Sequence, residues 1–98
     1  MSSMRQLMKQ AQEMQEKLQR ELAETVVEAS VGGGMVTVKM SGHYQLVAVK
    51  IDPEVMDRED PSMLEDLVVA AVNEAVRKIG ETMQGRMGAM AASLPGLF

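Results

Sequence analysis

The chain has 98 residues, which is enough for one domain built around a single core. It has no cysteine, so disulfides, thiolate chemistry and cysteine-based metal sites are excluded. Its net charge of -4 argues at first against a nucleic-acid partner, because phosphates select proteins with basic surfaces.

The first predicted element is a long amphipathic helix over residues 1–24. Its apolar residues recur at intervals of three and four and form one stripe: Met4, Leu7, Met8, Ala11, Met14, Leu18 and Leu22. Ser2 or Ser3 can cap its start. Charges spaced four residues apart cover the opposite face, as expected for an exposed helix.

Residues 25–51 predict three strands in an antiparallel meander with one buried face. Turn signals at Gly32–Gly34 and Ser41–His43 separate the strands. The expected inward row contains Val27, Ala29, Val31, Val36, Val38, Met40, Val47, Val49 and Ile51. A phosphate loop is disfavoured for the triple glycine, because Met35 and a strand follow where such a loop needs Gly-Lys-Ser/Thr and a helix.

An acidic connector over residues 52–60 leads to a second predicted helix over residues 61–84. Residues 52–66 hold seven carboxylates and one arginine, a net charge of -6, which leaves +2 for the rest of the chain. Asp60 and Pro61 are typical of a helix start. Glycines at positions 80, 85 and 88 weaken the far end of this helix, so residues 85–98 are predicted to form a mobile tail.

The length of the first helix favours association. About twenty helical residues span about 30 Å, whereas six or seven strand residues span only about 20 to 24 Å. The apolar stripe and the open edges of a three-stranded sheet both need cover, and a second copy can supply it. Pairing of the two helices within one chain is the competing explanation.

No catalytic or metal site is apparent from the residue pattern. His43 is the single histidine and lies in a turn signal, and the carboxylates of the connector match no calcium loop. We therefore expect no enzyme, no cofactor, no metal and no small-molecule substrate. The N-terminal residues lack an apolar signal region and no stretch is long enough to span a bilayer, so a cytoplasmic protein without membrane contact is expected.

Several segments together resemble the YbaB/EbfC family of bacterial nucleoid-associated proteins. They are MKQAQEMQ (8–15), GGGMVTVKMSG (32–42), VKIDPE (49–54), MLEDLVVAAVNEA (63–75) and LPGL (94–97). The resemblance covers most of the chain. It implies a single α+β domain over residues 1–98 that forms a homodimer with a shared sheet and projecting helices.

The resemblance also implies a protein of the cytoplasm and nucleoid that binds double-stranded DNA and affects its conformation, in nucleoid organisation or gene regulation. Its DNA contacts are attributed to the helical arms, which makes the basic residues of the two helices the candidate site: Arg5, Lys9, Lys17, Arg20, Arg77, Lys78 and Arg86. Such residues contact phosphates without reading bases, so sequence preference should be weak. From spacing alone, a merely solvated helix face explains them better. An adaptor that binds proteins of the DNA-maintenance machinery is the alternative function.

Overall fold

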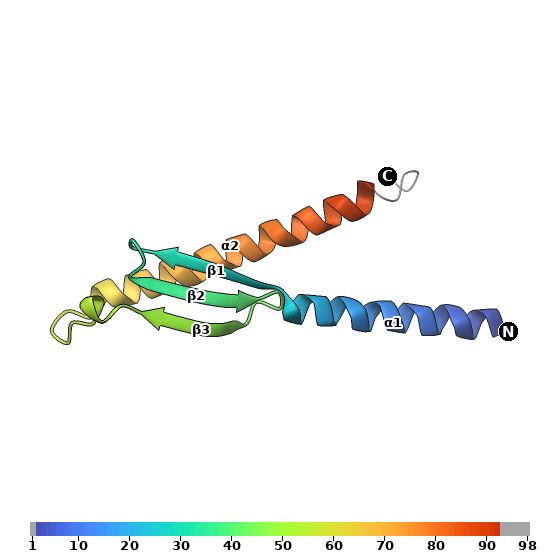
Figure 1. Ribbon diagram of the computed structural model, residues 1–98, viewed down its shortest axis with the longest axis horizontal. Coiled ribbons are helices and arrows are strands. Elements are labelled where there is room, and N and C mark those ends of the chain that lie inside the picture. Colours follow the sequence, from blue (N-terminus) through green and yellow to red (C-terminus); the bar gives the residue numbers. More distant parts are fainter. Residues whose placement is uncertain (1, 93–98) are drawn as a thin grey trace.

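The computed structural model describes residues 2–92, and its elements follow the predicted order of helix, sheet and helix (Figure 1). They are α1 (Ser2–Glu24), β1 (Val26–Val31), β2 (Val36–Ser41), β3 (Leu46–Ile51), the short 3-10 helix η1 (Pro53–Val55) and α2 (Ser62–Ala92). The predicted α+β class is confirmed, and the bounds of α1 agree with the helix expected over residues 1–24.

The sheet is an antiparallel meander in the order β1-β2-β3. Its register places Val38 between Ala29 of β1 and Val49 of β3, so these three side chains share a face. The triple glycine forms the turn between β1 and β2, as predicted, and all three glycines have positive φ values of 64°, 69° and 95°. Residues with a Cβ rarely adopt that conformation, which explains the glycine run without a phosphate ligand.

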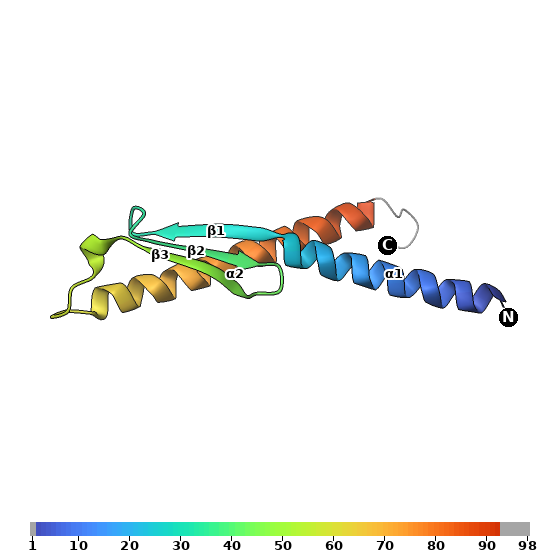
Figure 2. The same cartoon turned by 60° about the horizontal axis from the view of Figure 1, so that its bottom comes forward.

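The core lies between α2 and one face of β1 and β2 (Figure 2). Alanines at positions 71 and 75 let the helix approach the sheet closely, and Ile79 fills the space beside them. Each fully buried aliphatic side chain of this kind contributes about 1.5–3 kcal/mol. The buried cluster consists of Ala29, Val36, Val38, Met40, Ala71, Ala75 and Ile79.

β3 extends the sheet beyond the cover that α2 provides. Val49 remains 47% exposed and Val47 60% exposed, although alternation places them in the predicted inward row. The prediction that they are buried is therefore wrong for a single chain. One helix is about 10–12 Å wide and strands lie about 4.8 Å apart, so α2 covers two strands and leaves the third open.

α2 is longer than predicted. It ends at Ala92, whereas the sequence predicts a helix to residue 84 and a mobile tail from residue 85. Gly85 and Gly88 each weaken the helix by about 1 kcal/mol, but the residues around them are good helix formers and the next proline is Pro95. Residues 85–92 are thus helical, and residues 93–98 of the expected tail lie outside the described part.

α1 projects away from the sheet, at the end where the last turns of α2 also emerge (Figures 1 and 2). The molecule measures 69 × 25 × 15 Å and has a radius of gyration of 19.4 Å. A compact domain of this length has a radius of gyration of about 13 Å. The difference arises because α1 contributes almost nothing to the core: residues 3–21 are all exposed, and Leu22 is the first half-buried residue.

Candidate nucleic-acid interface

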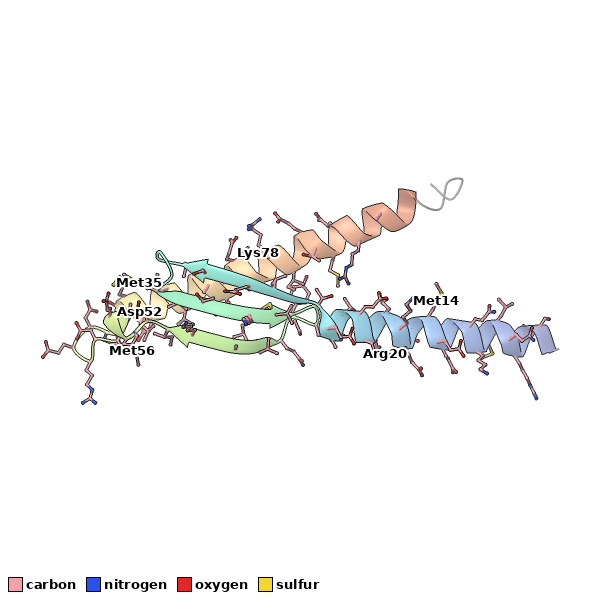
Figure 3. The ribbon with its side chains drawn as sticks, in the orientation of Figure 1. Met14, Arg20, Met35, Asp52, Met56 and Lys78 are labelled. Atoms are coloured by element: carbon pink, nitrogen blue, oxygen red, sulfur yellow. The ribbon has the colours of Figure 1, made fainter. Side chains whose placement is uncertain are left out.

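The projecting helix α1 carries four of the seven predicted contact residues. Arg5, Lys9, Lys17 and Arg20 are all exposed, and none of their side chains forms an ion pair or hydrogen bond within residues 2–92. In Figure 3, Arg20 lies on the part of α1 that stands clear of the sheet. Four cationic side chains on an exposed rod are therefore available to an anionic partner without breaking an existing contact.

Charge is unevenly distributed along α1. Residues 2–12 contain Arg5 and Lys9 and no acid, for a net charge of +2. Residues 13–24 contain two bases and four acids, for a net charge of -2. The positive potential of the helix is therefore concentrated at its free tip, and Arg5 and Lys9 are the best placed of the four to meet phosphates.

The three basic residues of α2 are engaged within the chain. Arg77 forms ion pairs with Glu74 and Glu81, which lie one turn away on either side. Its hydrogen bond lowers the pKa of Glu74, and the two carboxylates raise the pKa of Arg77 above its ordinary value. The ammonium of Lys78 donates to the carbonyl oxygen of Glu28 at 2.8 Å, on the edge strand β1.

Arg86 lies at the root of α1, where its Nη2 donates to the Thr25 hydroxyl at 2.8 Å. Twenty residues separate Thr25 from Arg5 on α1, which corresponds to about 30 Å along the helix axis. The structure therefore does not gather the seven predicted residues into one patch. Within the described part of the chain, the α1 group has no side-chain partners and the α2 group has structural ones.

The acidic connector lies at the end of the molecule opposite the tip of α1. Asp52 and Met56 mark that end in Figure 3. Some of its carboxylates have local roles: Asp52 accepts from the backbone N–H of Glu54 at 2.9 Å, and Asp60 accepts from that of Ser62 at 3.3 Å. A phosphate backbone is repelled from this end, so the charge pattern favours approach from the α1 side.

Sequence reasoning missed the residues that hold α1 at its root. His43 is exposed in a turn, as predicted, but its Nε2 also lies 3.2 Å from the carbonyl oxygen of Gln19 on α1. The neighbouring Gly42 is buried against the last turn of α1. These contacts join residues about twenty positions apart, so no local sequence pattern predicts them.

The described residues contain neither a metal-binding cluster nor a membrane-spanning helix. No group of three or more His, Asp or Glu side chains among them could hold a metal ion. In the same part of the chain, neither helix has a stretch that is long and apolar enough to cross a membrane.

Comparison with known proteins agrees with this arrangement. Residues 1–94 match the model of the YbaB/EbfC DNA-binding family. The chain is 47% identical over 97 residues to a nucleoid-associated protein of Chloroflexus aurantiacus, with 96% of this chain and 97% of the relative covered. It is 49% identical over 98 residues to one of Koribacter versatilis, with coverage of 96% and 95%.

The fold is also similar to the crystal structure of an uncharacterized protein from Helicobacter pylori, with a TM-score of 0.73, 23% identity and coverage of 92% of this chain and 95% of that one. The family match and the names of the relatives confirm the predicted function, a nucleoid-associated DNA-binding protein. With a match over nearly its whole length and relatives close to half identical, the chain belongs to the YbaB/EbfC DNA-binding family.

Proposed function

We propose that the protein acts as a homodimer in the cytoplasm and nucleoid, where its α1 arms bind the phosphates of double-stranded DNA. The observation that carries this proposal is the projecting α1, whose four basic side chains have no partner among residues 2–92, while those of α2 have partners within the chain. The protein works by binding alone, in nucleoid organisation or gene regulation, and has no catalytic step.

The arms contact the backbone of the duplex rather than its base edges. Arg5 and Lys9 lie one turn apart on the helix, so both reach the same stretch of phosphates. Lys and Arg contacts to phosphate position a protein without reading sequence. Sequence preference is therefore weak, and two arms held by one dimer affect the conformation of the duplex by gripping it at two places.

The open side of β3 supports the dimer. Val49 is exposed on the sheet face that α2 covers elsewhere, and the outer edge of β3 has no neighbouring strand within residues 2–92. On α2, Val76 lies two residues, or about 200°, from Lys78, which reaches β1. The exposed Val76 therefore points toward the β3 side. A second copy joined edge to edge through β3 extends the sheet and covers both valines.

Binding to duplex DNA at increasing salt tests the phosphate contacts. Log affinity should fall linearly with log salt, by about 0.9 per phosphate neutralised. Replacing Arg5 and Lys9 by Ala removes four charges from a dimer. This change should reduce the slope by up to about 3.6 and weaken binding to all sequences by at least about tenfold at low salt.

Arg77→Ala is the matched control, because it also removes an arginine from an exposed helix face but one that pairs with Glu74 and Glu81. It should change affinity by less than about threefold. Arg77→Ala removes two charges from a dimer, so a loss in log affinity half as large as that of the double variant would show that only total charge matters and would refute the assignment to α1. Absence of binding to duplex DNA at low salt would refute the function itself.

The exposed apolar stripe of α1 favours a second function, that of an adaptor for proteins of DNA maintenance. Met8 and Met14 are exposed large hydrophobic residues of this stripe, and flexible Met side chains suit protein contacts. The adaptor function predicts a partner that survives nuclease treatment and is lost when Met8 and Met14 are replaced by Glu. A partner that nuclease removes is bridged by DNA and supports the first function.

A further inference from the structure

The root of α1 is held by the turn between β2 and β3. The backbone N–H of Gly42 donates to two carbonyl oxygens at once, that of Leu22 at 3.0 Å and that of Thr25 at 2.9 Å. His43 Nε2 donates to the carbonyl oxygen of Gln19 at 3.2 Å. The carbonyl of Leu22 lies in the last turn of α1, where carbonyls lack intrahelical partners, so Gly42 satisfies a group that would otherwise face water.

Gly42 fits this place because it has no side chain. A Cβ at position 42 would lie 2.6 Å from the carbonyl oxygen of Leu22 and 3.1 Å from its Cα. Both are backbone atoms, so they cannot rotate away as a side chain would. Any larger residue must therefore push the last turn of α1 away from the sheet.

Thr25 links the same root to α2. Its hydroxyl donates to the carbonyl oxygen of Glu21 at 2.6 Å and accepts from Nη2 of Arg86 at 2.8 Å. The end of α1 is therefore hydrogen-bonded to two separate elements, the β2–β3 turn and α2. Two attachments fix both the position and the direction of α1, whereas a single attachment would let the helix pivot about one point.

We propose that Gly42 and Thr25 are positioning residues that set the direction of the α1 arm and thereby the geometry in which it meets DNA. The inference rests on the proposed DNA contact of α1. An arm of 23 residues is about 35 Å long. A displacement of about 1 Å at its root, at the helix radius of about 5 Å, therefore moves the tip by roughly 7 Å. That exceeds the spacing of adjacent phosphates along one strand's axis, about 3.4 Å.

Distance measurement between two spin labels tests arm direction without DNA. The chain has no cysteine, so Gln12→Cys on α1 and Glu65→Cys on α2 provide unique attachment sites. Labelled chains are mixed with an excess of unlabelled protein, so that each distance arises within one chain. Gln12 lies about 18 Å from the end of α1, half as far as the tip, so Gly42→Ala should shift or broaden the distance distribution by roughly 3–4 Å, and Thr25→Val should broaden it. Gly80→Ala, at a glycine where an added Cβ meets no described atom outside its own stretch of helix, should leave it unchanged.

Duplex binding by the same variants, in chains without labels, completes the test. A changed distance with unchanged helix content and at least about fivefold weaker DNA binding supports the inference. Native distances in both Gly42→Ala and Thr25→Val overturn it, whatever their DNA affinity. Changed distances with native DNA affinity support control of the arm by these residues and contradict the proposed DNA contact of α1. Thr25→Val keeps the side-chain shape, so it decides the matter if Gly42→Ala fails to fold.

Discussion

Among single residues, Tyr44 has an unusual backbone. It follows Gly42 and His43 in the β2–β3 turn, and its φ of 61° lies in the left-handed region that residues with a Cβ rarely enter. Its amide donates to the carbonyl oxygen of Ser41 at 2.9 Å, which closes the turn. The conformation is therefore imposed by the hairpin, and the tyrosine adopts it at a cost of about 1 kcal/mol.

Asn tolerates the left-handed region better than Tyr, so Tyr44→Asn should raise the free energy of unfolding by about 0.5–1 kcal/mol. Urea denaturation followed by circular dichroism measures the change. Gln45→Asn is the control, because Gln45 does not have a positive φ and should gain nothing. A loss of stability of more than about 1 kcal/mol in Tyr44→Asn would show that the half-exposed ring contributes packing that outweighs the strain.

At the level of elements, the two parts of α2 are stabilised by different interactions. Up to Met83 it packs on the sheet, and beyond that residue it emerges from the body, where Arg86 still reaches Thr25 but an added Cβ at Gly85 or Gly88 meets no described atom outside its own stretch of helix. The stability of the emerging part therefore depends mainly on helix propensity, whereas packing dominates in the covered part.

Gly85→Ala and Gly88→Ala should each raise hydrogen-exchange protection of the amides in 84–92 by up to about fivefold, equivalent to about 1 kcal/mol. Global stability should hardly change, because these residues lie beyond the sheet. Gly80→Ala provides the contrast: it follows the buried Ile79, so it should stabilise the whole domain by about 1 kcal/mol. Lower protection in 84–92 would mean that the glycines serve a close contact with another chain.

The elements themselves were predictable because each has a local signature. The stripe from Met4 to Leu22 predicts α1 nearly to the residue, and alternating valines predict the strands. The end of α2 cannot be predicted from the glycine penalty alone, because the good helix formers around Gly85 and Gly88 outweigh it. Arg77 could have been recognised as engaged, because Glu74 and Glu81 stand at helical spacing. The partners of Lys78 and Arg86 lie 50 and 61 residues away, which no local pattern encodes.

For the whole molecule, shape and charge are arranged along one axis. The acidic connector and the tip of α1 lie at opposite ends of a particle 69 Å long. A domain of this size buries only a modest share of its surface, and an elongated one buries less. The apolar residues left open, Val49 on β3 and Val76 on α2, therefore represent stabilisation that one chain cannot obtain by itself.

Val49→Glu tests whether a second copy supplies that stabilisation. In an isolated chain a 47% exposed position tolerates a carboxylate, so a monomeric protein should keep its stability. In the proposed dimer the two copies of the carboxylate enter a covered apolar seam, and the molecule should dissociate or require at least about a hundredfold higher concentration to dimerise.

Val26→Glu is the matched control: Val26 is a 50% exposed strand valine, but it lies on β1, at the far edge of the sheet. Sedimentation velocity over a range of concentrations distinguishes the cases. If Val49→Glu and Val26→Glu sediment alike as dimers, the β3 seam is not the interface, and if the unaltered protein sediments as a monomer there is no dimer to explain.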